Sequence, residues 1–414
     1  MRISWLAAAL AIYAPLASAP GQFERELTLP PLLHPQAACA VLDARATAYA
    51  AGPNAGMTLW ADSRPVPFAL TINSPEESSG DPAKIANFRT AANSTSFDLL
   101  MPARSYSSVT LDLAAPGTSA DAIWQAQVGS GAGANLGRFV LFDLSAANGP
   151  IHTTVDFAER SDPLLHITLQ PAISRAQLRG AWIAPSRSQQ TLFTTVAELA
   201  PTKEAIRTVA QFSIPQGVPV ERVAFQISGT EAFRRHVTVT TAPTTAPENT
   251  SVTPDVAAGY IQQIHAQRNG VLLDAHDLSL PAVLPDNTRS PMRVIVTVDN
   301  GNAPPLPIRT VQLQMRRRQI CFTAGAGVSH WRLFYGPAAA QFTTLGSPPR
   351  SLIQRESPMT AQLGPEKLAA DFHPLSPPAS SPTRPLWLVL ALVLVSASLL
   401  AMLLRIARIP HIRQ

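Results

Sequence analysis

The sequence predicts an all-β protein made of tandem antiparallel β-sandwiches, followed by one C-terminal transmembrane helix. Three observations support this fold class: short segments that alternate apolar and polar residues, a repeated order of those segments, and one long apolar run near the end. Period-two runs of four to eight residues between Pro, Gly, Asn and Asp are typical of antiparallel sandwiches and barrels. Charged residues make up only 14% of the chain and prolines number 39, which favours strands over helices.

The alternating segments recur with turn residues between them. Clear examples are Val109 to Leu113 and Leu164 to Leu169 in the first half, and Met292 to Asp299 in the second. Helical patterns are scarce outside the two ends of the chain. We therefore expect strands through most of the central part.

The order of these segments occurs twice. VTLDL at 109–113 corresponds to VAFQI at 223–227, a glycine-led strand that ends in Asn-Gly follows in each half, and LLHITL at 164–169 corresponds to MRVIVTV at 292–298. Units of about 110 residues match the size of a jelly-roll or related sandwich. The alternative is chance similarity, because strands resemble one another.

These patterns predict the domain organisation. Clustered proline and serine with little apolar periodicity indicate a semi-extended stalk between the folded part and the apolar run. We expect a signal peptide at 1–21, an N-terminal β region at 22–90, a first β-sandwich at 91–200, a second β-sandwich at 201–340, a Pro/Ser-rich stalk at 341–385, a transmembrane helix at 386–404 and a basic cytoplasmic tail at 405–414.

The N-terminus has the pattern of a secretory signal peptide. A basic start precedes an apolar run from Ile3 to Ala14, which is too short to span a membrane comfortably. Cleavage after Ala19 and cleavage after Gly21 fit the small residues there equally well. The alternative is an uncleaved anchor.

The segment from Leu386 to Leu404 has no charged residue and is long enough to cross the roughly 30 Å hydrocarbon core as a helix. A buried core helix would show a polar face, whereas this segment is apolar on all sides apart from two serines. Three arginines follow it, so the positive-inside rule places the C-terminus in the cytoplasm. We expect a single-pass protein of the cell inner membrane with a periplasmic ectodomain and the lipid bilayer as partner of its C-terminal helix.

The ectodomain is close to neutral. The whole chain has 32 Lys and Arg against 27 Asp and Glu, but one arginine lies in the signal peptide and three follow the apolar segment. We therefore expect no nucleic-acid partner. The dense run Arg316-Arg317-Arg318 has two interpretations: rim charges that discourage edge-to-edge aggregation, which we prefer, or a ligand patch.

The chain has two cysteines, Cys39 and Cys321. In an oxidising periplasm they can form a disulfide, which would link the first strand region to the last. The alternative is that both are buried, unpaired thiols that act as small apolar side chains.

No motif in the sequence indicates catalysis. The chain lacks G-x-S-x-G, S-x-x-K, H-E-x-x-H, a Walker loop and C-x-x-C, and its nine histidines are scattered singly. We therefore assign no catalytic, cofactor-binding or metal-ligating residue and expect no enzyme activity.

Aromatic side chains are the remaining route to function, because glycan-binding sandwiches stack a sugar face on Trp or Tyr near loops. For each candidate the alternative is burial in the core, which is the more frequent fate of large aromatics. The possible ligand-stacking residues are Trp60, Trp124, Trp182 and Trp331, together with Tyr106 and Tyr335.

Several segments carry a resemblance that covers nearly the whole chain. They are CAVLDA at 39–44, MTLWADSRPVPFALT at 57–71, LGRFVLFDLS at 136–145, PVERVAFQI at 219–227 and ICFTAGAGVSHWRLFYG at 320–336. The sequence resembles an uncharacterised family of bacterial envelope proteins, a domain of unknown function, with motifs similar to LRLYADGREVPYALT and L-x-Y-G. The resemblance implies a signal peptide, a β-rich ectodomain with galactose-binding-like sandwiches and a C-terminal span. It carries no catalytic residue.

The leading functional hypothesis is a membrane-anchored periplasmic binding or scaffolding protein of unknown ligand, without catalysis, whose partners are envelope proteins or glycans. One alternative is a glycan-binding module protein. A further alternative is a glycan-processing hydrolase, which needs paired Asp or Glu side chains that face a cleft.

Overall fold

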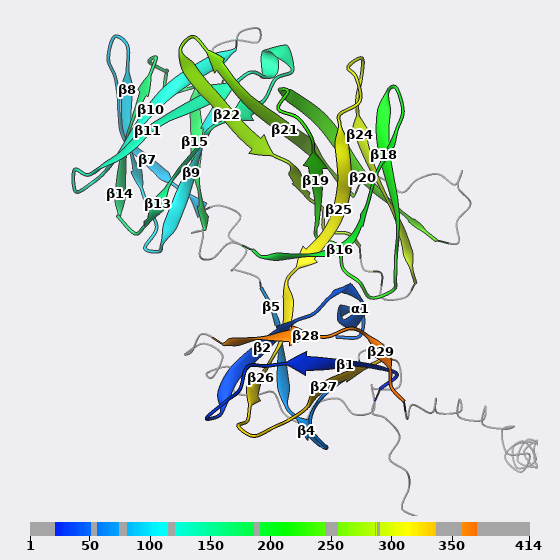
Figure 1. The fold of residues 1–414 in the computed structure, drawn as a ribbon. Helices are drawn as coiled ribbons and strands as arrows, with labels where there is room; N and C mark the ends of the chain where they lie inside the picture. The colour runs from blue at the N-terminus through cyan, green and yellow to red at the C-terminus, as the bar shows by residue number, and fades with distance from the viewer. Residues whose placement is uncertain are drawn as a thin grey trace, which may run out of the picture.

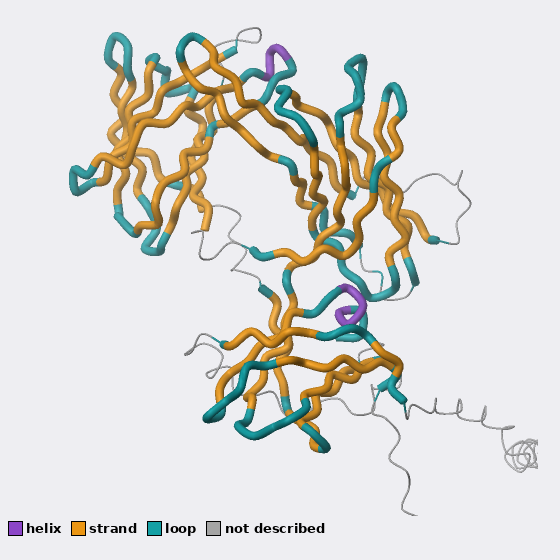
Figure 2. The backbone as a smooth tube through the Cα atoms, in the orientation of Figure 1, coloured by secondary structure: helices purple, strands orange, loops and turns teal. Residues whose placement is uncertain are grey.

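In a computed structural model the described part of the chain is built almost entirely of β-strands (Figure 1, Figure 2). Helix is limited to α1 (Ala44–Thr47) and a 3-10 turn at Ser145–Ala147. The predicted all-β fold is therefore confirmed. The structure describes residues 21–50, 56–73, 81–114, 121–185, 191–244, 256–285, 287, 290–336 and 358–370.

Three predicted segments lie outside the described residues. They are the signal peptide at 1–21, apart from Gly21, the transmembrane helix at 386–404 and the basic tail at 405–414. Within the described ranges, no helix is both long and apolar enough to cross a membrane. These segments stay predictions.

The two ends of the described chain form one domain, which we call the base domain. Its nine-stranded sheet has the order β4-β3-β27-β1-β28-β2-β26-β5, and β29 also pairs with β1. Leu59 and Ile320, from opposite ends of this order, share one core, so the sheet bends over itself. Its strands are β1 (Phe23–Thr28), β2 (Gln36–Val41), β3 (Met57–Ala61), β4 (Arg64–Val66), β5 (Phe68–Ile72), β26 (Arg318–Ala324), β27 (Trp331–Tyr335), β28 (Met359–Leu363) and β29 (Lys367–Leu368).

Strand β28 lies inside this sheet. Leu27 of β1 pairs with Leu363 in antiparallel register on one side of β28, and Cys39 of β2 pairs with Thr360 in parallel register on the other. Met359, Ala361 and Leu363 alternate toward the core, which gives the segment the apolar face of a strand. Residues 358–370 therefore belong to the base domain, which corrects the prediction of a continuous stalk at 341–385.

The first sandwich packs a six-stranded sheet, in the order β12-β11-β10-β14-β8-β7, on a four-stranded sheet, in the order β13-β9-β15-β6. Alternating buried residues of both sheets, such as Val109 and Ile167, form its core. Its strands are β6 (Asp81–Pro82), β7 (Lys84–Thr90), β8 (Thr95–Leu100), β9 (Tyr106–Leu113), β10 (Ala122–Ser130), β11 (Asn135–Asp143), β12 (Ile151–His152), β13 (Thr154–Arg160), β14 (Leu164–Gln170) and β15 (Leu178–Pro185).

The second sandwich has the same topology. Its sheets have the orders β22-β21-β20-β24-β18-β17 and β23-β19-β25-β16, so every strand corresponds to the first-sandwich strand numbered ten lower. The predicted internal repeat is confirmed. Its strands are β16 (Phe193–Leu199), β17 (Thr202–Lys203), β18 (Arg207–Ile214), β19 (Arg222–Ile227), β20 (Phe233–Pro243), β21 (Ala257–Arg268), β22 (Val271–Asp277), β23 (Ser279–Pro281), β24 (Met292–Asp299) and β25 (Ile308–Arg316).

The domain boundaries differ from those predicted at 22–90, 91–200 and 201–340. Strands β6 and β7 belong to the first sandwich, β16 belongs to the second, and β26 and β27 return to the base domain. The reason is that strand partners far apart in sequence decide where a strand belongs, and a linear pattern does not contain them.

The chain crosses between the base domain and the sandwiches beside Arg317. The Arg317 amide donates to the carbonyl of Leu192, and its carbonyl accepts from the amide of Asn73, at 2.7 and 2.8 Å. The buried carboxylate of Glu221 lies 2.7 Å from Arg316 Nε and 3.8 Å from a terminal nitrogen of Arg318. This arginine run therefore stabilises a domain junction through its backbone hydrogen bonds and its contacts with Glu221. Both predicted interpretations, rim charges and a ligand patch, are corrected by this finding.

The two sandwiches touch through the hairpin β21–β22, which crosses toward β11 in Figure 1. Phe142 and Leu144 of the first sandwich form an apolar cluster with Ile264 and Leu273 of the second. The side-chain amide of Gln262 hydrogen-bonds the backbone of Ile151 in both directions, at 3.0 and 2.6 Å. The sandwiches are therefore held side by side by direct contacts.

Cys39 and Cys321 form a disulfide. They are directly opposite in the antiparallel pair β2–β26, with Cα atoms 4.1 Å apart, and both are buried. Of the two alternatives left open by the sequence, the structure therefore shows the bonded pair. The bond encloses a loop with a sequence separation of 282 that contains both sandwiches.

Removal of this disulfide is expected to destabilise the base domain by about 5 kcal/mol, because it frees a very long loop in the unfolded chain. The measurement is denaturant unfolding of the wild type against the double variant Cys39→Ala, Cys321→Ala. A reductant should destabilise the wild type and leave the double variant unchanged. Equal stability of the two oxidised proteins would contradict the expectation.

Candidate functional site

Four of the six aromatic candidates are buried. Trp124 is 2% exposed and Trp331 is 5% exposed, while Tyr106 and Tyr335 are fully buried. Their strands direct them to the core side of the sheets, as the alternation of neighbouring residues requires. Ligand stacking is therefore wrong for Trp124 and Trp331 and for the two tyrosines.

The other two tryptophans reach the surface in different ways. Trp60 is half-buried, its ring packs edge-on against Phe334 at 6.3 Å between centroids, and its Nε1 donates to Thr58. Trp182 is 47% exposed, and within the described residues its ring has no aromatic or cationic partner. Of the six candidates, all in the described part of the chain, only Trp182 offers a free aromatic face.

Trp182 lies on the outer face of the four-stranded sheet of the first sandwich. Its neighbours along β15, Ala181 and Ile183, are buried in the core, so the indole points outward. Across the sheet Trp182 is opposite Pro82 on one side and Thr110 on the other. None of these cross-strand neighbours is a large side chain.

Small residues also flank Trp182 along its own strand. The next residues on the same face are Gly180 and Ala184. A Cβ atom at Gly180 would lie 3.9 Å from Trp182 Nε1, so the glycine keeps that edge of the indole open. We call this surface the Trp182 platform and define it by Trp182 with Pro82, Thr110, Gly180 and Ala184.

Polar groups surround the platform. The hydroxyls of Thr110 and Thr154 are 2.8 Å apart. Arg179 donates from Nε and Nη2 to one carboxylate oxygen of Asp112, at 3.0 and 2.5 Å. An open indole with hydroxyl and charged groups beside it can stack on the apolar face of a sugar and hydrogen-bond its hydroxyls.

The second sandwich provides an internal comparison. In the repeat Ala224 takes the place of Thr110, and Ala224 is opposite Gln312 just as Thr110 is opposite Trp182. Gln312 donates from Nε2 to Glu198 at 3.0 Å. The same fold is thus built with a hydrogen-bonded amide at this position, so the sandwich topology does not require the exposed tryptophan.

Tyr260 is the other well-exposed aromatic, at 48%. The guanidinium of Arg234 lies 3.6 Å from its ring centroid, and His236 packs against it at 5.1 Å. A cation over the ring already occupies the face that a ligand would need. Tyr260 is therefore a poor stacking surface despite its exposure.

Three carboxylates line a pocket of about 510 Å³ on the base domain. Glu24 lies 3.6 Å from Arg332, and Glu26 lies 3.9 Å from His330. Asp62 accepts a hydrogen bond from the His330 amide at 2.9 Å. These carboxylates already have basic or backbone partners.

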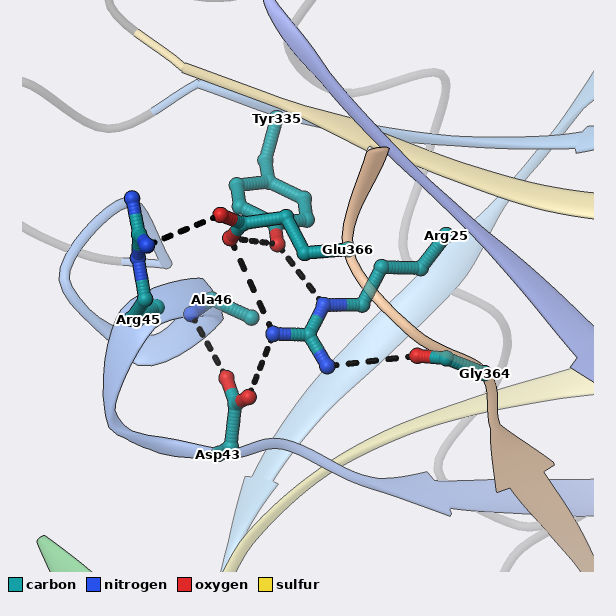
Figure 3. Close-up of polar contacts among 7 residues, drawn as sticks. All are labelled: Arg25, Asp43, Arg45, Ala46, Tyr335, Gly364 and Glu366. Carbon is teal, nitrogen blue, oxygen red and sulfur yellow. Dashed lines mark hydrogen bonds and ion pairs between the residues drawn. The ribbon is translucent and has the colours of Figure 1, made fainter. Parts of the chain in front are cut away.

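A partly buried polar network that sequence reasoning missed holds the segment 358–370 to the rest of the base domain (Figure 3). Arg25 donates from Nε to the Tyr335 hydroxyl at 2.8 Å, and from Nη1 to the carbonyl of Gly364 at 3.2 Å. Its Nη2 contacts Asp43, and the Tyr335 hydroxyl donates to Glu366 at 2.6 Å. We call Arg25, Asp43, Tyr335 and Glu366 the latch network.

The latch network favours a protonated Tyr335 phenol and a charged Arg25 guanidinium. Burial, reinforced by the hydrogen bond to Glu366, raises the pKa of Tyr335 above its ordinary value. Burial acts against the charge of Arg25, but the hydrogen bond to Tyr335 and the charge of Asp43 outweigh it, so the pKa of Arg25 is raised. A neutral phenol and a permanent cation suit a structural clasp rather than proton transfer at neutral pH.

The described residues contain no group of three or more His, Cys, Asp or Glu side chains placed to hold a metal ion. The latch network left no motif in the sequence because its members are distributed over more than 300 positions. Two of its members lie in segments that the sequence analysis singled out, Asp43 in CAVLDA and Tyr335 in LFYG, but nothing local connects them to Arg25 and Glu366.

Glu366→Ala is expected to destabilise the base domain by about 2 kcal/mol, because the buried Tyr335 hydroxyl loses a charged acceptor. Glu366→Gln should lose less, since the amide oxygen still accepts that bond. Limited proteolysis and denaturant unfolding measure the effect, with the neighbouring Lys367→Ala as control. A segment 358–370 that resists protease equally in all variants would contradict the role of the latch network.

Tyr335→Phe tests the sign of the pKa shift. A raised pKa means that the folded protein keeps the phenol proton when the unfolded chain loses it, so the stabilisation is complete below about pH 10 and declines above it. The stability difference between wild type and Tyr335→Phe should be constant from pH 7 to 9 and shrink by up to about 1.4 kcal/mol per pH unit above pH 10. Denaturant unfolding across this range decides, and a difference that grows with pH would contradict the assignment.

No family model matches this chain, and no curated protein matches it. Among solved structures, the infectious bursal disease virus Gx strain structure shares 12% identity over 79% of this chain and 86% of that chain, with a TM-score of 0.15. The CBM22-1-CBM22-2 tandem domain from Paenibacillus barcinonensis Xyn10C shares 10% identity over 66% of this chain and 95% of that chain, with a TM-score of 0.16. Likenesses at these scores carry no argument about function.

Proposed function

We propose that this protein is a membrane-anchored extracytoplasmic binding protein whose first sandwich binds glycans through the Trp182 platform. The observation that carries the proposal is an indole left open among small residues, at a position where the sister sandwich has a hydrogen-bonded glutamine. Stacking on the exposed indole would remove part of its apolar surface from water, which favours binding of a sugar face there.

The cellular setting of the proposal rests on the sequence. A signal peptide at 1–21 and an apolar segment at 386–404 would place the folded part in the periplasm of a bacterial envelope protein and tie it to the inner membrane. Polysaccharides and glycosylated envelope components are the ligands available there. Binding rather than catalysis is proposed because the platform presents stacking and hydrogen-bonding groups without a nucleophile or an acid–base pair.

The proposal predicts that the full-length chain, purified in mild detergent, binds a subset of an array of bacterial polysaccharides. Trp182→Ala should weaken that binding at least tenfold, since the stacking of the sugar face on the indole and the burial of apolar area are lost together. Trp182→Phe should retain part of it.

Two variants serve as matched controls. Gln312→Ala changes the equivalent position of the second sandwich, and Tyr260→Ala removes an aromatic of equal exposure whose face is occupied. Both should bind as the wild type does. Array binding that survives Trp182→Ala, or an array without any signal, would overturn the proposal.

A further inference from the structure

One end of the second sandwich contains a pocket of about 350 Å³, which we call the end pocket. It lies between the loop that joins β19 to β20 and the loop that joins β24 to β25. Its volume is at the lower end of small-molecule sites, so it suits one compact ligand rather than a polymer. It is separate from the Trp182 platform, which lies on the other sandwich.

Arg235 brings an uncompensated positive charge to the end pocket. Its one hydrogen bond in the described part of the chain runs from Nη1 to the carbonyl of Arg234, at 3.2 Å. Its Nε is shielded from solvent and has no acceptor there. No carboxylate of the described residues lies within 4.0 Å of it, whereas the partly buried Arg25 and Arg104 each have one.

The remaining polar groups of the pocket are fixed in place. Gln263 is only 6% exposed, and its Nε2 donates to the carbonyl of Gly229 at 2.9 Å. The Ser228 hydroxyl is held between Arg309 Nε, at 2.7 Å, and the carbonyl of Pro307, at 3.3 Å. A polar rim that is already oriented lowers the entropy lost when a ligand binds.

The rest of the wall is apolar. Phe233 and Leu306 are buried side chains that line it, and Pro304 and Pro305 complete it. Proline cannot rearrange its φ angle or donate a hydrogen bond, so this wall is stiff and favours an apolar ligand surface. A cation beside such a wall matches a molecule with one anionic group and an apolar body.

We propose that the end pocket binds a compact carboxylate, with the carboxylate at Arg235 and the body against Phe233 and the proline wall. Guanidinium is the group that best matches a planar carboxylate, and a partly desolvated pocket strengthens the pair. Glu231 also lines the pocket, and within the described residues no ion pair joins it to Arg235. The negative charge of Glu231 is expected to weaken the binding of an anionic ligand by electrostatic repulsion.

The test is calorimetric titration of the full-length chain with four small probes. Cyclohexanecarboxylate carries both features, its neutral isostere cyclohexanecarboxamide lacks the charge, acetate lacks the body, and D-glucuronate presents an acidic sugar. Binding of cyclohexanecarboxylate at least tenfold tighter than of the carboxamide and of acetate is expected. Tighter binding of glucuronate would identify an acidic sugar as the source of the carboxylate.

Variants separate the pocket from general charge effects. Arg235→Met should weaken the carboxylate at least tenfold, Arg235→Lys should weaken it less, and Glu231→Gln should strengthen it several-fold by removing the repelling anion. Arg207→Met, which removes an arginine of the same sandwich that already pairs with Glu204, should have no effect.

Equal binding of carboxylate and carboxamide by the wild type would overturn the proposal even if Arg235→Met failed to fold. So would a carboxylate affinity that Arg235→Met and Glu231→Gln leave unchanged, or the absence of binding by both cyclohexanecarboxylate and glucuronate. None of these results depends on Trp182, so the proposal for the end pocket and the proposal for the Trp182 platform are tested independently.

Discussion

The pairing of the two ends of the described chain in one sheet is the constraint on which the rest of the structure depends. Strand β28 completes the base domain between β1 and β2, and the disulfide and the latch network fix the strands around it. Both sandwiches are therefore a single long insertion between strands of one domain. Backbone hydrogen bonds join Arg317 to Asn73 and to Leu192, so three connecting segments lie side by side at the junction of the domains.

This arrangement separates support from recognition. The base domain contains the last described residues before the predicted membrane anchor, and the charged groups of its latch network are used in internal contacts. The sandwiches share one topology but differ in their surfaces. Trp182 of the first corresponds to Gln312 of the second, which is hydrogen-bonded to Glu198. The second sandwich also has the end pocket. One repeated scaffold therefore carries two different proposed sites.

Alternation and repetition were sufficient to predict the all-β class and the duplicated sandwich. The same alternation could have identified Trp124 as buried, because it shares its face with Ala126 and Val128. It could not have shown that Trp182 is exposed, because Trp182 stands in a run that is apolar on both faces. The base domain could not be predicted, because Phe23 pairs with Tyr335 and no local pattern records a partner 312 positions away. The end pocket was missed because loops bring its residues together only in the folded chain.

Amide hydrogen exchange of the segment 359–363 in the full-length chain tests the central claim most directly. An interior strand bonded on both sides opens only when the domain does, so the amides of β28 should exchange as slowly as those of β26. Exchange of 359–363 within seconds, at the rate of an unstructured chain, while β26 stays protected would contradict the account, because the base domain would then be closed without its C-terminal strand.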